Sequence, residues 1–243
     1  MTEITRHELA LVMPVYNEEE CIVEVVQAWD NELIRLGIDS VMLVLNDGSR
    51  DSTRQKIARF EGNDRIRVVN KENSGHGPTI LTGYGLAVEE AEWVFQTDSD
   101  NEMSPAFFHE LWERRNNFDA LFGSRCAREQ GMGRKLISAV SRFAVRVFFG
   151  AGVTDVNTPY RLIRAPLLKK IIAGIPFGTF APNVIVSGAV VTLGARIYNH
   201  SVPHEGRKTG RISIVKWKLW KAAVKSFVQT LHYRFSASYR STK

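Results

Sequence analysis

The first half of the chain alternates between two patterns of hydrophobic and polar residues. Short apolar runs predict buried strands at residues 9–13, 41–45, 66–69, 93–97 and 120–122. Longer segments with apolar positions at helical spacing lie between them and predict helices over 17–36, 52–61, 78–91 and 105–115. Strands that alternate with helices are typical of parallel βαβ units. The pattern therefore predicts an α/β fold with an open, mostly parallel sheet and helices on both faces.

Polar residues and a glycine mark the expected ends of these helices. Asn17 is a favourable N-cap, and Glu18 to Glu20 place negative charge at the positive end of the helix dipole. Gly37 is expected to end the first helix, because glycine adopts the left-handed conformation that often follows one. Ser52 is expected to cap the second helix.

Polar motifs follow the predicted strands where each strand ends. They cover residues 14–18, 46–49, 73–77, 98–102 and 123–125. In open α/β sheets, ligands bind at the carboxyl ends of the strands. We therefore expect one ligand site at this edge of the sheet.

Three acids at alternate positions, Asp98, Asp100 and Glu102, form the most unusual of these motifs. Anionic groups near one point repel each other unless a cation lies between them. Mg2+ or Mn2+ prefers such oxygen ligands and leaves positions open for phosphate oxygens. The same residues also fit a solvated turn before the helix at 105–115, and this alternative stays open at this point.

The other motifs have structural alternatives too. Residues 46–49 also fit an ordinary turn, because Asn, Asp and Gly serve turns routinely. Gly75 and Gly77 fit a strand-to-helix loop as well as a close approach to phosphate. The absence of a GxxxxGKS or GxxxxGKT sequence excludes a P-loop NTPase, and no full GxGxxG opens the first βα unit, which disfavours a dinucleotide-binding dehydrogenase.

Composition limits the class of protein. The 243 residues suit one domain, or one domain with an extension. Cys21 and Cys126 lie far apart without metal-ligand spacing, which favours a reducing compartment. The polar N-terminus predicts no signal peptide. Residues 171–195 carry no charge, but Pro176 and Pro182 interrupt them, so we expect a buried helix and not a membrane span.

Charge is divided between the two halves of the chain. Residues 1–133 contain 13 Lys/Arg and 24 Asp/Glu, a net charge of −11, whereas residues 134–243 contain 19 Lys/Arg and two acids, a net charge of +17. Such a basic half suits anionic lipid, a phosphorylated substrate or nucleic acid. Nucleic-acid binding also needs exposed aromatic platforms for the bases. No such module pattern occurs, so we expect no nucleic-acid partner and keep a non-catalytic nucleic-acid-binding protein as a remote alternative.

The order of the motifs resembles the family 2 glycosyltransferases of the GT-A (Rossmann-like) fold. The matching segments are, in order, 15–18, 46–53, 73–77, 98–100 and 123–125. Residues 155–161 and 207–213 resemble the polyprenyl-phosphate branch of the family, which includes dolichol-phosphate mannose synthase-like proteins. The resemblance covers about residues 8–215 and implies a transferase that uses a nucleotide sugar.

The resemblance also implies a role for each matching position. Asp98, Asp100 and Glu102 would hold Mg2+ or Mn2+ against the donor diphosphate. Donor or acceptor phosphate would meet Arg125, Arg134 and Arg207. The nucleotide sugar would contact Pro14, Tyr16, Glu18, Asp47, Gly77, Asp98 and Ser99. The chain departs from the family pattern at Asn46, Glu102 and Ile214, where Asp, Gln and Lys are usual, and this leaves the donor and the acceptor open.

The scarcity of acids in the second half bears on the acceptor. Transfer to a hydroxyl needs a general base, yet no acid lies between Asp155 and Glu205, and Asn183 occupies a position where the family often has Glu. A phosphate monoester is already an anion and needs no base. We therefore expect inverting transfer to undecaprenyl or dolichyl phosphate. The alternatives are Asp155 as the base of a sugar-to-sugar transferase of cell-surface polysaccharide, or Asp155 as a structural partner of Arg161.

Two basic amphipathic stretches, 134–150 and 215–235, fit helices that lie in a membrane interface. We accordingly divide the chain into a GT-A catalytic domain, 1–214, and a basic amphipathic helix and tail, 215–243. We expect a cytoplasmic protein bound peripherally to the inner face of the cell membrane. Packing of the second stretch on the protein's own core, or on another copy in a homo-oligomer, is the alternative.

Overall fold

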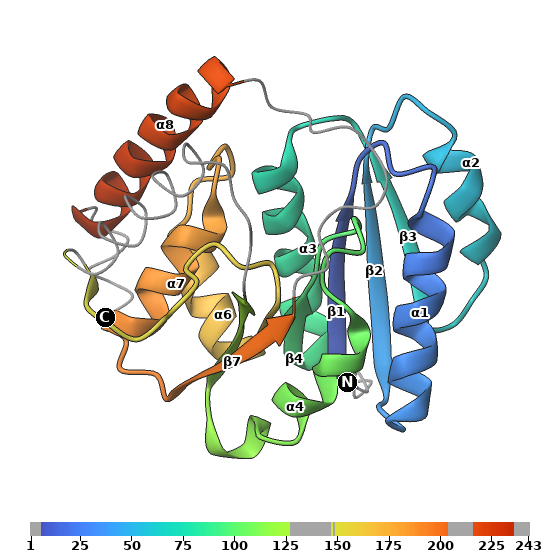
Figure 1. The fold of residues 1–243 in the computed structure, drawn as a ribbon, viewed down its shortest axis with the longest axis horizontal. Coiled ribbons are helices and arrows are strands. Elements are labelled where there is room, and N and C mark those ends of the chain that lie inside the picture. The colour runs from blue at the N-terminus through green and yellow to red at the C-terminus, as the bar shows by residue number, and fades with distance from the viewer. Residues whose placement is uncertain (1–5, 127–146, 148, 204–215, 236–243) are drawn as a thin grey trace, which may run out of the picture.

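The computed structural model describes residues 6–126, 147, 149–203 and 216–235 (Figure 1). Within this part of the chain seven strands form one sheet, in the order β3-β2-β1-β4-β6-β5-β7. The strands are β1 (His7–Val15), β2 (Ser40–Asp47), β3 (Ile66–Lys71), β4 (Ala91–Gln96), β5 (Ala120–Cys126), β6 (Arg161–Arg164) and β7 (Ile197–Pro203). The sheet is parallel except for β6, which runs antiparallel to both β4 and β5.

All five predicted strands are present, and β6 and β7 are additional. β6 has only four residues, and β7 lies at the edge of the sheet with most of its side chains half-buried. Neither segment therefore carries the continuous apolar run that identifies a central parallel strand.

The α-helices are α1 (Ile22–Arg35), α2 (Thr53–Ile57), α3 (His76–Glu90), α4 (Phe108–Trp112), α6 (Ala165–Ile172), α7 (Pro182–Thr192) and α8 (Lys216–Phe235). The predicted helix over 52–61 is α2 followed by a 3-10 turn, Ala58–Phe60. The predicted helix over 105–115 is the short α4 between two 3-10 turns, Pro105–Phe107 and Arg115–Asn117. None of the helices that the structure describes is long and apolar enough to cross a membrane.

The expected N-cap at Asn17 is wrong. Helix α1 begins at Ile22, and Asn17 lies before it in the left-handed region with φ 55°. Its side-chain oxygen accepts the backbone N–H of Arg50, and its own N–H donates to Ser49 Oγ at 3.0 Å. The Asn17 side chain is thus occupied by the loop after β2 and is not available to cap a helix.

Helices cover both faces of the sheet and make two hydrophobic cores. Leu9 and Leu11 of β1 point into a core shared with α1 and α4. Ala10 and Val12 point into the opposite core, shared with α3, α6 and α7. All four side chains are fully buried, as expected for the centre of a parallel sheet.

Helix α3 packs closely on the sheet at Gly83. A Cβ atom placed there would lie 2.4 Å from Val12 Cγ1 and 3.0 Å from Leu45 Cδ1. Both neighbours are themselves fully buried. The close approach of α3 to β1 and β2 therefore depends on the absence of a side chain at this position.

We expect Gly83→Ala to lower the free energy of unfolding by about 1–3 kcal/mol, because an added methyl group overpacks the core. The matched control is Gly85→Ala in the same helix, where a Cβ meets nothing within 4 Å. That variant should gain up to about 1 kcal/mol from helix propensity. Urea denaturation of both variants measures the difference, and equal effects would contradict this account of α3 packing.

Candidate active site

A cavity of about 580 Å³ opens at the carboxyl ends of β1, β2 and β4. The first residues of α3 and α7 line its other side. Eight of the predicted site residues line this cavity: Pro14, Tyr16, Glu18, Asp47, Asp98, Ser99, Asp100 and Arg125. The strand order brings these residues together from four separate motifs, as the parallel sheet predicts.

The other predicted site residues lie elsewhere. Glu102 lines a small adjoining hollow with Asp98, Asp100 and Arg125. Gly77 is buried at the start of α3, where a Cβ would lie 2.2 Å from the carbonyl oxygen of Thr179. Two predicted phosphate-binding residues lie outside the described residues: Arg134 and Arg207.

The acid loop after β4 contains a buried carboxylate oxygen. Oδ1 of Asp98 has no hydrogen-bond partner, and Nε2 of His76 lies 3.7 Å from it. Asp100 Oδ1 accepts the backbone N–H of Glu102 at 3.2 Å. A buried carboxylate oxygen without a donor, on a residue that lines the cavity, fits a metal ligand. Among the described residues, however, no three His, Cys, Asp or Glu side chains form a group that could hold a metal ion.

Arg125, at the end of β5, forms a two-point ion pair with Asp155. Its Nε and Nη2 donate to the Asp155 carboxylate at 2.7 and 3.1 Å. Burial acts to raise the pKa of Asp155, but the hydrogen bonds and charge of Arg125 outweigh it, so the pKa lies below its ordinary value. Asp155 is therefore held as an anion by a guanidinium that itself lines the cavity.

Pairing of Asp155 with Arg161 is not observed. Arg161 is fully buried, and it donates to the carbonyl oxygens of Thr158 and Asn183. Burial lowers the pKa of Arg161. The partner of Asp155 comes instead from β5, because β5 and β6 are adjacent in the sheet and the segment before β6 passes close to Arg125.

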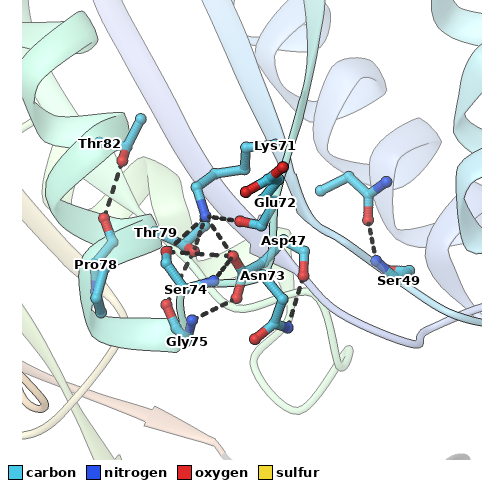
Figure 2. A network of polar contacts seen from close by, with 11 residues as sticks. Asp47, Ser49, Lys71, Glu72, Asn73, Ser74, Gly75, Pro78, Thr79 and Thr82 are labelled. Carbon is cyan, nitrogen blue, oxygen red and sulfur yellow. Dashed lines mark hydrogen bonds and ion pairs between the residues drawn. The ribbon is translucent and has the colours of Figure 1, made fainter.

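Asp47 organises the loop before α3 (Figure 2). Its carboxylate accepts the backbone N–H of Ser74 at 2.8 Å and of Gly75 at 2.9 Å, and it also pairs with Lys71. The side-chain amide of Asn73 donates to its backbone carbonyl at 2.8 Å. Burial acts to raise the pKa of Asp47, but the hydrogen bonds from Lys71 and Ser74 prevail and the pKa is lowered. One carboxylate thus joins the ends of β2 and β3 to the start of α3.

A thiol links two of the predicted motifs. Cys21 Sγ lies 3.5 Å from the carbonyl oxygen of Ser99 and 3.6 Å from Oε2 of Glu18. Cys21 is buried. It therefore connects the loop after β1 to the acid loop after β4.

The start of α7 contributes a neutral amide to the cavity. Asn183 is buried, and its Oδ1 lies 3.4 Å from the hydroxyl of Tyr84, which donates to Gln96 Oε1 at 2.6 Å. Arg161 binds the backbone carbonyl of Asn183. Asn183, at a position where the family often has Glu, is thus an amide within a buried polar cluster.

Several further cavity residues were not assigned a role from the sequence, among them His76, Asn157 and Phe180. His76 lies at the start of α3 and Asn157 before β6, and both belong to motifs that match the family pattern. Their positions in these motifs could have identified them as site residues. Phe180 lies in the α6–α7 loop and is 39% exposed. No local pattern in that loop distinguishes Phe180 from Phe177, which is also exposed.

The described fold is similar to that of known GT-A glycosyltransferases. The structure of glucosyl-3-phosphoglycerate synthase from Mycobacterium tuberculosis with phosphoglyceric acid has a TM-score of 0.69 and 18% identity, over 93% of this chain and 80% of that chain. The same synthase with Mn2+ and UDP-glucose has a TM-score of 0.68 and 19% identity, over 94% and 79% of the two chains. At this identity the likeness establishes the fold alone.

The family follows from a sequence model. The model of glycosyl transferase family 2 matches residues 10–172, which run from within β1 to the end of α6. The chain belongs to this family and is a glycosyltransferase.

Two relatives are similar along much of the sequence. An uncharacterized glycosyltransferase of Synechocystis is 26% identical, over 89% of this chain and 67% of that protein. Undecaprenyl-phosphate 4-deoxy-4-formamido-L-arabinose transferase of Pseudomonas aeruginosa is 26% identical, over 72% of this chain and 52% of that protein. The chain matches about half the length of the latter.

We expect the free energy of unfolding to fall as the pH is lowered through about 4, the pKa of an unfolded Asp. Asp47 and Asp155 have lowered folded pKa values, so their contributions are complete above that pH and are lost as the pH falls through the folded values. Asp47→Asn should cost about 1–3 kcal/mol at neutral pH and flatten this acid dependence.

Urea denaturation across the acid range measures both effects. The exposed Asp64 provides the control, since Asp64→Asn should change stability by less than about 0.5 kcal/mol. A cost for Asp47→Asn no larger than that of the control would contradict a structural role for the Asp47 network.

Proposed function

We propose that this glycosyltransferase moves a sugar, with inversion, from a nucleotide sugar to a polyprenyl phosphate. The observation that carries the proposal is the buried Oδ1 of Asp98, which accepts no hydrogen bond and belongs to a residue that lines the cavity with Asp100 and Arg125. The cavity volume of about 580 Å³ lies in the range typical of small-molecule sites.

A divalent cation, Mg2+ or Mn2+, fits the acid loop. Asp98 and Asp100 would hold it; Glu102 is proposed as a third ligand from the sequence resemblance, since the three side chains do not form a metal-holding group among the described residues. When bound, such an ion supplies Lewis-acid stabilisation of the leaving diphosphate. Solved structures of the Mycobacterium tuberculosis synthase contain Mn2+ together with UDP, which supports divalent-metal use in this fold.

The nucleotide occupies the end of the cavity formed by β1 and β2. Tyr16 is 36% exposed and offers a ring against which a base can stack. Glu18, Asp47 and Ser99 place polar groups beside it, and Pro14 completes the wall. Gly77 contributes through the start of α3, where backbone N–H groups favour an anion.

Arg125 supplies positive charge near the reacting centre. Its ion pair with Asp155 fixes the guanidinium, and the charges of Asp98 and Glu102 contribute to its raised pKa, although burial opposes them. A fixed cation of this kind stabilises charge that develops on phosphate. Arg134 and Arg207 are proposed as further phosphate contacts from the sequence resemblance alone.

The acceptor is proposed to be a phosphate because, among the described residues, neither of the two positions considered for a base can serve a hydroxyl. Asp155 is paired with Arg125, and Asn183 is an amide. The Pseudomonas aeruginosa relative is named as an undecaprenyl-phosphate transferase, which supports the same class of acceptor. Transfer to a sugar hydroxyl in cell-surface polysaccharide synthesis is the second candidate, and it would need Asp155 as the base.

A polyprenyl acceptor requires contact with a membrane. The C-terminal part of α8 exposes Val228 and Phe235 at 56% and 64%, beside the more covered Phe227. Such side chains suit the interfacial region of a bilayer. We propose peripheral attachment at the cytoplasmic face of the cell membrane, with 1–214 as the catalytic domain and 215–243 as the membrane-associating segment.

We expect Asp100→Ala to abolish transfer and Asp98→Asn to reduce it strongly, because each removes a proposed metal ligand. Transfer of labelled sugar to undecaprenyl phosphate in vesicles measures activity. A thermal-shift screen with UDP- or GDP-sugars and Mn2+ measures donor binding, worth about 2.7 kcal/mol at one hundred times Kd. The exposed Glu113 provides a control, Glu113→Gln, which should behave as the unchanged chain. Full turnover by Asp100→Ala would exclude the proposed metal site.

We expect Asp155→Asn to reduce kcat by less than the roughly 10²–10⁴-fold typical of a lost general base. The variant loosens Arg125 but removes no group that takes a proton from a phosphate acceptor. The pH dependence of kcat should therefore be unchanged. If Asp155→Asn lowered kcat by roughly 10²–10⁴-fold and left binding of the acceptor lipid unchanged, the sugar-to-sugar reaction would be favoured.

A further inference from the structure

The loop between α6 and α7 is held against the start of α3. Thr179 is buried, and both its N–H and its hydroxyl donate to the carbonyl oxygen of Pro176, at 3.0 and 2.6 Å. The carbonyl oxygens of Thr179 and Phe180 lie 2.2 and 2.5 Å from the position of a Cβ at Gly77. The loop therefore rests on the α3 backbone at Gly77, where no side chain separates the two segments.

A side chain from α8 binds the same loop on its other side. Gln229 Oε1 accepts the backbone N–H of Phe180 at 2.9 Å, and Gln229 Nε2 donates to the carbonyl oxygen of Gly178 at 3.3 Å. Helix α8 lies beside α7 (Figure 1). Tyr233 anchors it, because this residue is buried and its hydroxyl donates to the carbonyl oxygen of Ile171 at 3.3 Å. Gln229 thus ties the loop to an anchored helix.

The loop position determines where the Phe180 ring lies. Phe180 lines the cavity together with Pro182 and the polar residues Arg125, Asn157 and Asn183. These residues come from β5, the segment before β6, the α6–α7 loop and the start of α7, whereas Tyr16 and Asp47 lie at the ends of β1 and β2. An apolar wall beside amide and guanidinium groups suits a sugar ring, which presents C–H groups on its face and hydroxyls at its edge.

We propose that Phe180 is the apolar wall of the sugar subsite and that Gln229 is its positioning residue. The sugar face packs on Phe180, while Asn157 and Asn183 face its hydroxyls. Gln229 acts only through the loop, since it holds the N–H of Phe180 and the carbonyl of Gly178. This inference rests on the proposed function, because it assigns the donor's sugar to one end of the cavity.

Binding of paired ligands tests the assignment in the full chain. Calorimetry with Mn2+ compares UDP with UDP-glucose and GDP with GDP-mannose, for the unchanged chain, Phe180→Ala, Gln229→Ala and the double variant. Each single variant should weaken the nucleotide sugar about threefold to tenfold, the size of a lost aromatic contact, and leave the nucleoside diphosphate unchanged. The double variant should be no weaker than Phe180→Ala, because the two residues act as a unit.

His232→Ala is the matched control, since this residue of the same helix is exposed and should leave both ligands unaffected. Amide hydrogen exchange tests the positioning without any ligand. The N–H of Phe180 should exchange faster in Gln229→Ala and not in His232→Ala.

The assignment of Phe180 to the sugar would be overturned if the losses of binding free energy in the two single variants added up in the double variant. It would also be overturned if the variants weakened nucleoside diphosphate and nucleotide sugar equally. Unchanged exchange at Phe180 would overturn the role of Gln229. If the unchanged chain bound nucleoside diphosphate but no nucleotide sugar, that result would exclude the proposed donor class and therefore also the sugar subsite.

Discussion

The burial of both faces of β1 is the constraint on which the structure depends. β1 pairs in parallel with β2 and β4, and its residues from Leu9 to Met13 are fully buried. A polar side chain within this strand would lose its water without gaining a partner. Polar side chains are therefore confined to the ends of the strands. Because the three strands run in the same direction, Tyr16, Asp47 and Asp98 emerge at one edge and line one cavity.

The acids in and around that cavity are not all neutralised to the same extent by basic side chains. Lys71 neutralises Asp47, and Arg125 neutralises Asp155. Asp98 has no hydrogen bond to its buried oxygen, and His76 at 3.7 Å is its recorded ionic contact. An added cation gains most where an anion is buried and incompletely paired, since Coulomb interactions strengthen away from bulk water. The proposed metal therefore belongs at Asp98, and the paired acids belong to the scaffold around it.

The sequence predicts the strands and the site edge well because both depend on local pattern. Apolar runs identify the five strands, and eight predicted residues do meet in one cavity. The errors involve contacts between distant residues. Asp155 pairs with Arg125, 30 residues away, and not with the nearby Arg161. Asn17 binds the loop after β2, 33 residues away, and so does not cap α1. Such pairings depend on strand order, which no local pattern contains.

The same dependence on distant contacts explains why no local sequence pattern identifies the α6–α7 loop as part of the site. Its backbone groups are satisfied by Gln229, 49 residues from Phe180, and its path is set by Gly77, which belongs to a third segment. The loop position thus depends on α8, the helix that also exposes Val228 and Phe235. Transfer to a lipid acceptor requires the reacting carbon to meet a nucleophile from the membrane while water is kept away. A wall positioned by the proposed membrane helix would couple these two requirements, because the helix proposed to meet the lipid also holds the loop that carries the proposed sugar wall.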